Sequence, residues 1–114
     1  RGLVVPQEMM NHLKNADLVV AHNASFDRAM LRRTANWTND LPWRCSVRQI
    51  KWRKEHVSFV GLTSLLDRYK IHRNTGHRAL DDALSLAKLM LIRDHTGDTF
   101  LDQLLATGNL KQDA

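Results

Sequence analysis

The sequence has almost no cysteine and no long hydrophobic run. Cys45 is the single cysteine among 114 residues, which excludes an internal disulfide and is typical of a protein from a reducing compartment such as the cytoplasm. The apolar runs are short, as in Leu18 to Ala21, so the sequence predicts no membrane span. The first residues lack both the apolar core of a signal peptide and an initiator methionine, so residue 1 need not be the natural start.

What the sequence does contain is an ordinary globular composition with an excess of basic residues. Apolar residues make up 43% and charged residues 25%, which excludes a disordered chain, and the length allows one domain with a modest core. A net charge of +5 attracts phosphate polyanions. The basic residues cluster at Arg28, Arg32 and Arg33 and again at Arg44, Arg48, Lys51, Arg53 and Lys54. A solvated helix face is the favoured interpretation of each cluster.

Hydrophobic periodicity predicts many helices and few strands. Helices are expected over residues 6–16, 24–33, 48–55, 62–69, 78–94 and 100–106, with a buried strand over 18–21 and a weak one over 43–47. A parallel strand needs hydrogen-bonding neighbours, and no other segment has strong β character. We therefore expect a single partial α/β domain over 1–114, with a core over 6–94 and a helical tail over 97–114. The first strands of its sheet are expected upstream of this chain.

Asp27 is the first candidate site residue. On a helix that begins at Ala24, it falls in the apolar sector between Met30 and Leu31, whereas Ser25, Arg28 and Arg32 share the solvent side. A buried carboxylate must be paired, capped, protonated or bound to a metal. The alternative is a carboxylate that interacts favourably with the helix macrodipole in the first turn.

A pair of adjacent carboxylates repeats this pattern on the last long helix. Asp81 shares its side with Ser85 and is expected to be solvated, whereas Asp82 sits between Leu86 and Leu89 on the apolar stripe. The first-turn dipole is again the alternative interpretation of Asp82.

Two inward carboxylates predict one acidic site for a hard cation. We expect Asp27 and Asp82 to converge at the end of the buried strand, near enough to share a divalent ion. His77 precedes Asp82 by five residues and directly follows Gly76, so its imidazole is placed to reach this site. With an unperturbed pKa near ~6.5, it can take a proton from water. A surface or helix-capping histidine is the alternative.

Both acidic segments resemble motifs of one nuclease family. The segment 18–27, Leu-Val-Val-Ala-His-Asn-Ala-Ser-Phe-Asp, resembles the second motif of DEDD-type exonucleases, and 77–83, His-Arg-Ala-Leu-Asp-Asp-Ala, resembles the third. The spacing from His77 to Asp82 is that of the histidine subgroup, typified by the proofreading epsilon subunit of DNA polymerase III, exonuclease X and RNase T. Residues 43–46 resemble the intervening strand and 62–71 the helix before the third motif. The likeness covers about 6–94.

The resemblance implies a ribonuclease-H-like α/β fold, here its mostly helical C-terminal part, and a two-metal 3'→5' exonuclease that uses Mg²⁺ or Mn²⁺. Asp82 would bind one metal directly, Asp27 the second, often through water, and His77 would be the general base. Asn23 and Phe26 would line the channel for the terminal nucleotide, although helix capping and core packing are the favoured roles for them. Nucleoside 5'-monophosphates would leave the 3' ends of single-stranded nucleic acid, with DNA favoured over RNA as the substrate. The sequence leaves open whether the domain proofreads for a DNA polymerase partner or acts as a free-standing nuclease.

The family's first motif, Asp-x-Glu, is absent from the chain. Asp27 and Asp82 can hold one Mg²⁺ together with waters and phosphates, but hardly a catalytic pair. We therefore expect this chain to be inactive or nearly so. The main alternative is a non-catalytic nucleic-acid-binding remnant. A helical interaction module without a site leaves two inward carboxylates unexplained, and a His-Asp metal phosphohydrolase needs an adjacent His-Asp pair that the sequence lacks.

Overall fold

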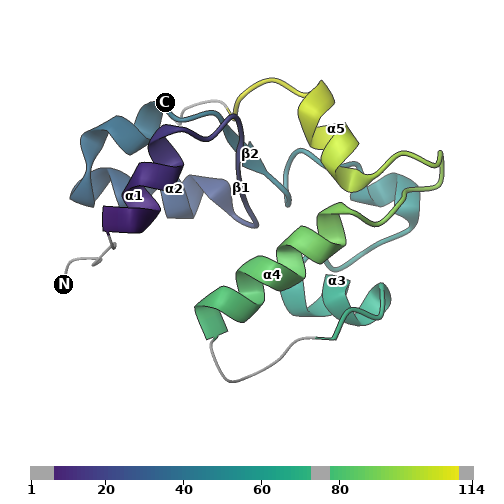
Figure 1. Ribbon diagram of the computed structural model, residues 1–114. Coiled ribbons are helices and arrows are strands. Elements are labelled where there is room, and N and C mark those ends of the chain that lie inside the picture. The colour runs from purple at the N-terminus through teal and green to yellow at the C-terminus, as the bar shows by residue number, and fades with distance from the viewer. Residues whose placement is uncertain (1–6, 73–77, 111–114) are drawn as a thin grey trace. The chain divides into compact units, whose positions relative to one another are not determined.

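The structure is a computed structural model that describes residues 7–72 and 78–110 (Figure 1). The chain divides into two compact units. Unit 1 comprises Arg1–Arg48 together with Gly108–Ala114, and unit 2 comprises Gln49–Thr107. The expected single domain over 1–114 stays a prediction, and each unit is described by itself. The described part is mixed helix and strand, in agreement with the expected α/β class.

Unit 1 is built on a small parallel sheet. Its elements are α1 (Gln7–Lys14), β1 (Val19–Ala21), α2 (Ala24–Thr34), a 3₁₀ turn η1 (Asn36–Asp40) and β2 (Trp43–Cys45). The register pairs Val19 with Trp43 and Ala21 with Cys45. Both expected strands form, although each covers only three residues, and β1 is only partly buried rather than buried as expected. The neighbour of β1 is therefore the weak strand β2. The apolar pattern of the sequence had not predicted this pairing.

The second edge of β2 is covered from the far end of the chain. The backbone amide of Leu110 donates to the Trp43 carbonyl oxygen at 2.8 Å, and Nη1 of Arg28 donates to the Leu110 carbonyl oxygen at 3.3 Å. Unit 1 thus takes a segment from beyond unit 2 to complete one side of its sheet.

The core of unit 1 seats α2 on the sheet. Ala24 and Leu31 from α2 pack with Trp43 and Cys45 from β2. The Trp43 indole Nε1 donates to the Thr38 carbonyl oxygen at 2.7 Å, and the Ala24 amide donates to Cys45 Sγ at 3.4 Å. The Ala24–Cys45 contact holds the start of α2 at the end of the sheet, and the Trp43–Thr38 contact ties η1 to β2.

Unit 2 is helical in the part that the structure describes. Its elements are a 3₁₀ turn η2 (Trp52–Glu55) and the helices α3 (Leu62–Arg68), α4 (Arg78–Met90) and α5 (Phe100–Ala106). The basic helix expected over 48–55 is wrong, because only the short turn of η2 forms there. Helix α4 ends at Met90 rather than at residue 94. No helix among the described residues is long and apolar enough to cross a membrane.

An aromatic cluster forms the centre of unit 2. The ring of Phe100 lies 4.7 Å from that of Trp52 and 5.5 Å from that of Tyr69, measured between centroids. Thr99 and Asp102 form a reciprocal capping box at the start of α5. Because Phe100 and Leu104 are fully buried, residues of the expected C-terminal tail belong to this core.

Candidate functional site

The carboxyl end of β1 leads directly into α2, and Asn23 stands at the junction. Its carbonyl oxygen accepts from the amides of Phe26 at 3.0 Å and Asp27 at 3.3 Å. Asn23 occupies the N-cap position of α2 as favoured, but its exposed side chain makes no capping hydrogen bond. Its assignment to substrate binding stays a prediction.

Phe26 lies outside the core. Its side chain is 60% exposed in the first turn of α2, so the favoured role in core packing is wrong. An exposed aromatic ring is a surface on which a nucleobase can stack. The channel-lining role of Phe26 therefore stays a prediction.

Asp27 lies in the first turn of α2, where burial disfavours its charged form. It is half-buried, one turn before the buried Leu31, which agrees with the expected inward direction. Burial raises the pKa of the Asp27 carboxyl above its ordinary value, because the desolvated carboxylate is disfavoured. A nearby cation would act in the opposite direction and lower this pKa.

The opposite side of α2 differs from the expectation. Arg28 was expected on the solvent side, but it is only 5% exposed and donates to the Leu110 carbonyl oxygen. Ser25 is half-buried, and its Oγ has no hydrogen-bond partner among the described residues. Arg32 and Arg33 are exposed as expected. The cause is tertiary, because residues 108–110 return to unit 1, and helix periodicity carries no information about such a return.

A histidine–serine pair at the end of the sheet was missed by the sequence analysis. Nδ1 of His22 lies 2.8 Å from Oγ of the buried Ser46, and this Oγ also donates to the Ala21 carbonyl oxygen at 3.3 Å. The register of β1 and β2 places His22 and Ser46 side by side, each one residue beyond its strand. Polar residues at the carboxyl ends of parallel strands are the usual position of ligand sites, and that signal could have identified the pair.

The two carboxylates of α4 differ from the expected arrangement. Asp81, expected to be solvated, is buried at 9% exposure, and Ser85 on the same side is buried as well. Asp82 is half-buried, and Ala83, expected on the inward stripe, is exposed. The prediction that Asp81 faces solvent is therefore wrong, whereas the metal-binding role of Asp82 stays a prediction.

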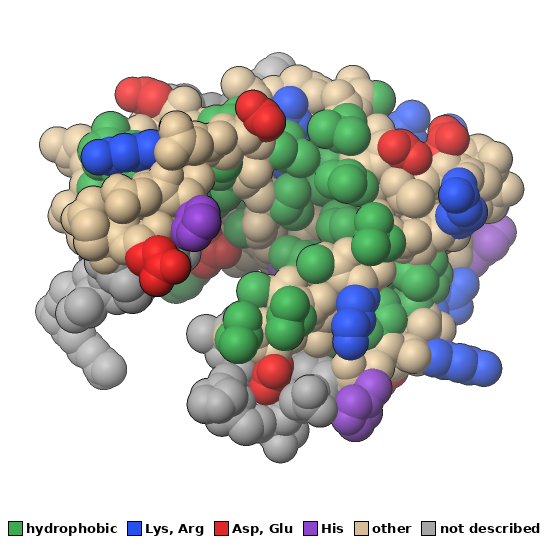
Figure 2. Space-filling model, viewed as in Figure 1, with side chains coloured by type: hydrophobic (Ala, Val, Ile, Leu, Met, Phe, Trp, Pro, Cys, Tyr) green, Lys and Arg blue, Asp and Glu red, His purple; other side chains and the backbone are tan. Residues whose placement is uncertain are grey.

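The reason lies in the composition of α4. Leu80 and Leu84 are exposed, and Figure 2 shows hydrophobic side chains along the visible side of this helix. Because apolar residues occur on both faces of α4, periodicity does not determine which face packs inward. The face with Ser85 and Leu89 is the one that packs.

The predicted site residues are not brought into one group by the described structure. Asp27 belongs to unit 1 and Asp82 to unit 2. His77 lies outside the described residues. Among the residues that the structure describes, no three His, Cys, Asp or Glu side chains form a metal-binding group. The shared metal ion is therefore untested.

A different acidic side chain, Asp94 in unit 2, is fully engaged in local structure. Its carboxylate accepts from the Thr96 hydroxyl at 2.6 Å, from the Thr96 amide at 2.8 Å and from Gln103 Nε2 at 2.7 Å. The Thr96 hydroxyl, followed by Gln103 and the amides of Thr96 and Asp98, lowers the pKa of Asp94 to about 2. This carboxylate closes the turn between α4 and α5.

Comparisons with known proteins assign no family. A scan against models of protein families found no match, and searches of curated proteins and of solved structures found none either.

Proposed function

We propose that this chain is part of a metal-dependent 3'→5' exonuclease domain of the DEDD type, with the histidine variant of the third motif. The proposal rests on the two motifs, one ending at Asp27 and one running from His77 to Asp82. Their order and spacing fit the ribonuclease-H-like architecture of such domains. We propose that fold for the complete domain as well.

The structural observation that supports the proposal most is the surrounding of Asp27. A half-buried carboxylate with a raised pKa follows the carboxyl end of a parallel strand, in the same turn as the exposed Phe26 and after the exposed Asn23. A divalent cation is the partner that would offset the desolvation of this carboxylate. An aromatic ring and an amide side chain beside it suit a nucleotide at a 3' end.

Carboxylate oxygens are ligands of the right kind for Mg²⁺ or Mn²⁺. Asp27 and Asp82 supply two negative charges, which suit one divalent ion rather than a catalytic pair. A bound metal pair would orient the terminal phosphate and stabilise the leaving 3' oxygen. Within this chain, His77 would accept a proton from water, Phe26 would stack on the terminal base, and Asn23 would orient it. We therefore propose that the chain binds one ion and a 3' end but hydrolyses little.

Binding of Mn²⁺ tests the proposal directly. Paramagnetic Mn²⁺ is titrated into the ¹⁵N-labelled protein, and broadened amide signals are expected around both Asp27 and Asp82. In Asp27→Asn, the Mn²⁺ concentration that gives the same broadening is expected to rise about tenfold or more. The matched control is Asp40→Asn, which removes an exposed carboxylate from the same unit. Broadening centred on Asp94 with none near Asp27 would contradict the proposal.

The predicted lack of turnover has its own assay. The chain is incubated with 3'-labelled single-stranded DNA and Mg²⁺, and release of nucleoside 5'-monophosphate is expected to stay near the background. Robust release that is lost in His77→Ala would show that the chain is catalytically complete.

A second candidate function is nucleic-acid binding without catalysis. Lys51, Arg53 and Lys54 are all exposed on and just before η2, so they are available to phosphates. Fluorescence anisotropy with single-stranded DNA over a range of salt tests this function. Replacing all three by alanine is expected to lower the slope of log affinity against log salt by about 0.7 per lost phosphate contact. Binding that is insensitive to Mg²⁺ and to Asp27→Asn would favour this candidate over the nuclease.

A further inference from the structure

Residues 108–110, the strap, lie along the outer edge of β2. Pro42 and Ser46 hydrogen-bond to β1, and backbone groups alternate in direction along a strand, so the Trp43 carbonyl points away from β1. There it accepts from the Leu110 amide at 2.8 Å. The strands that are expected upstream of this chain would extend the sheet at β1, so they do not compete with the strap for this edge.

Two arginines from different elements hold the strap. Nη1 of Arg28, in α2, donates to the Leu110 carbonyl oxygen at 3.3 Å, and Nη1 of Arg44, in β2, donates to Asn109 Oδ1. The strap thus brings together one arginine from each basic cluster of the sequence. Burial raises the pKa of the neighbouring Asp27, which is the opposite of what an adjacent guanidinium would do, so Arg28 points away from that carboxylate.

The strap has the properties of a segment that opens locally. Gly108 and Asn109 are exposed, and the Leu110 side chain is only partly buried against the core of unit 1. Segments with exposed backbone and little buried apolar surface open at a low cost in free energy. Arg28 is only 5% exposed, so opening would also return a buried cation to water.

The strap offers neutral oxygens to both cations. The Leu110 acceptor is a peptide carbonyl and the Asn109 acceptor is a side-chain amide. An ionised phosphate oxygen is a stronger acceptor for a guanidinium group, whose planar donors match phosphate in shape and charge. A phosphate that reaches Arg28 and Arg44 therefore competes directly with the strap.

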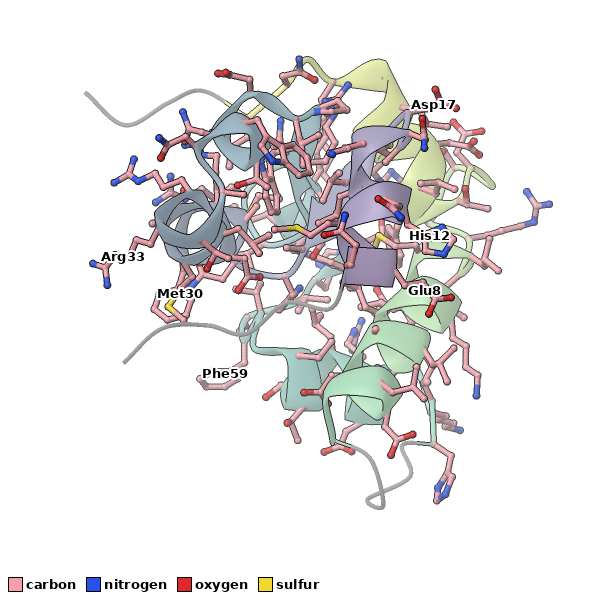
Figure 3. The ribbon with its side chains drawn as sticks, turned by 60° about the vertical axis from the view of Figure 1, so that its left-hand side comes forward. Glu8, His12, Asp17, Met30, Arg33 and Phe59 are labelled. Atoms are coloured by element: carbon pink, nitrogen blue, oxygen red, sulfur yellow. The ribbon has the colours of Figure 1, made fainter. Side chains whose placement is uncertain are left out.

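The surrounding charges favour a polyanion over a single ion. Arg32 is exposed one turn beyond the first strap arginine and adds a third cation on that side of α2. Figure 3 shows the carboxylates of Glu8 and Asp17 on the opposite side of unit 1 from Arg33, which lies in the last turn of α2. Asp40 is exposed just before β2, where water and salt screen its charge. Several linked phosphates can engage such spaced cations together.

We propose that the strap closes a phosphate-binding site formed by Arg28 and Arg44, and that the phosphates of a single-stranded nucleic acid displace it. Phosphate oxygens replace the Leu110 carbonyl oxygen and Asn109 Oδ1 as acceptors, and the Leu110 amide leaves the Trp43 carbonyl. The closed strap thus inhibits binding at this site. The site is separate from the proposed metal site and from the basic residues of η2, so it does not depend on either.

A short single-stranded oligothymidylate is the probe, and inorganic phosphate at the same total phosphate concentration is the comparison. Titration of the oligothymidylate into the ¹⁵N-labelled chain is expected to shift the amide signals of residues 108–110. Hydrogen exchange of the Leu110 amide is expected to become about tenfold faster at saturation, because that amide loses its acceptor. Inorganic phosphate is expected to leave this exchange rate nearly unchanged.

Two variants of the strap shift the competition in opposite directions. Asn109→Asp places a carboxylate against Arg44 and holds the strap closed, so the affinity for oligothymidylate is expected to fall about tenfold. The matched control is Asn36→Asp, which makes the same charge change at an exposed site of unit 1 and is expected to cost less than about twofold. Leu110→Pro removes the amide that anchors the strap and is expected to raise the affinity about threefold.

An unchanged exchange rate of the Leu110 amide at saturating oligothymidylate would overturn the proposal. Equal affinities of Asn109→Asp and Asn36→Asp would overturn it as well, because net charge alone would then explain the loss. Opening of the strap by inorganic phosphate as readily as by oligothymidylate would overturn the assignment to nucleic acid. Both asparagine variants are expected to leave the Mn²⁺ titration at Asp27 unchanged, so a failure here is distinguishable from a failure of the proposed nuclease function.

Discussion

Acidic side chains in unit 1 and unit 2 differ in whether local hydrogen bonds satisfy them. In unit 2 the Asp94 carboxylate accepts hydrogen bonds from its own turn, which lowers its pKa to about 2, and Asp102 completes a helix cap. In unit 1 burial raises the pKa of Asp27, and Ser25 Oγ has no partner among the described residues. Local hydrogen bonds thus satisfy Asp94 and Asp102 in unit 2, whereas Asp27 and Ser25 in unit 1 are polar groups that a ligand can satisfy. Desolvated or unsatisfied polar groups of this kind are typical of binding sites.

The largest expected effect concerns the aromatic core of unit 2. Phe100→Ala removes a fully buried ring that packs on Trp52 and Tyr69, so the free energy of unfolding of this unit is expected to fall by about 3–5 kcal/mol. Urea denaturation followed by the NMR signals of unit 2 measures the change. Phe59→Ala is the control, because this ring is 79% exposed and its removal is expected to cost less than about 0.5 kcal/mol. Equal losses in the two variants would contradict a closed aromatic core.

The next effect concerns the histidine–serine pair of unit 1. Ser46→Ala leaves Nδ1 of the partly buried His22 without its hydroxyl partner, so the stability of unit 1 is expected to fall by about 1–3 kcal/mol. The tautomer populations of His22, measured from its ring ¹⁵N shifts, are expected to change as well. Ser58→Ala, at an exposed site, serves as the control. An unaltered His22 spectrum in Ser46→Ala would show that the hydroxyl does not position the ring.

The capping box of α5 is expected to contribute less. Thr99→Ala removes the hydroxyl that accepts from the Asp102 amide at 3.1 Å, so the stability of unit 2 is expected to fall by about 1 kcal/mol. Thermal unfolding monitored on unit 2 signals tests this value. If Thr63→Ala, an exposed change within α3, costs as much, the cap is not the source of the loss.

The smallest effects are opposite pH dependences of the two units. The folded pKa of Asp94 lies below its ordinary value of 3.8, so its contribution is present above that pH and is lost as the pH falls toward about 2. The folded pKa of Asp27 lies above 3.8, so the folded state binds more protons there and unit 1 loses stability as the pH rises through the folded pKa.

Urea midpoints recorded separately for Ala24 and Leu104 between about pH 2 and pH 7 resolve the two trends. Asp94→Asn is expected to abolish the acid loss in unit 2, and Asp27→Asn is expected to stabilise unit 1 at neutral pH. A destabilised unit 1 in Asp27→Asn would mean that its carboxylate is already compensated in the folded state.

The sequence predicted the local elements well and the packing of helices less well. Its buried run became β1, and residues 100–106 form the expected helix α5. The prediction of a helix over 48–55 was wrong, because clustered charges without an apolar stripe do not stabilise a helix. Only the turn η2 forms there. The pairing of β2 with residues 108–110 could not be predicted, because it depends on a return of the chain from a distant position.

The candidate site was predictable only in part, for a physical reason. Asp27 is half-buried, but the rotation of α2 was predicted only in part, because Arg28 from the side expected to face solvent is buried and Phe26 is exposed. Asp81 was misplaced because α4 is apolar on both faces, so the periodic pattern fits two rotations of the helix. Phe26 was misplaced because a hydrophobic residue type does not by itself report burial at the first turn of a helix.

The return of residues 108–110 to β2 also constrains the order in which the protein can form. Every residue of unit 2 lies between the two segments that make up unit 1, so a ribosome releases all of unit 2 before the strand partner at Leu110 emerges. Contacts of such high sequence separation form slowly, whereas the helices of unit 2 depend on nearby contacts. During synthesis, the half that carries Asp27 is therefore the last to be completed.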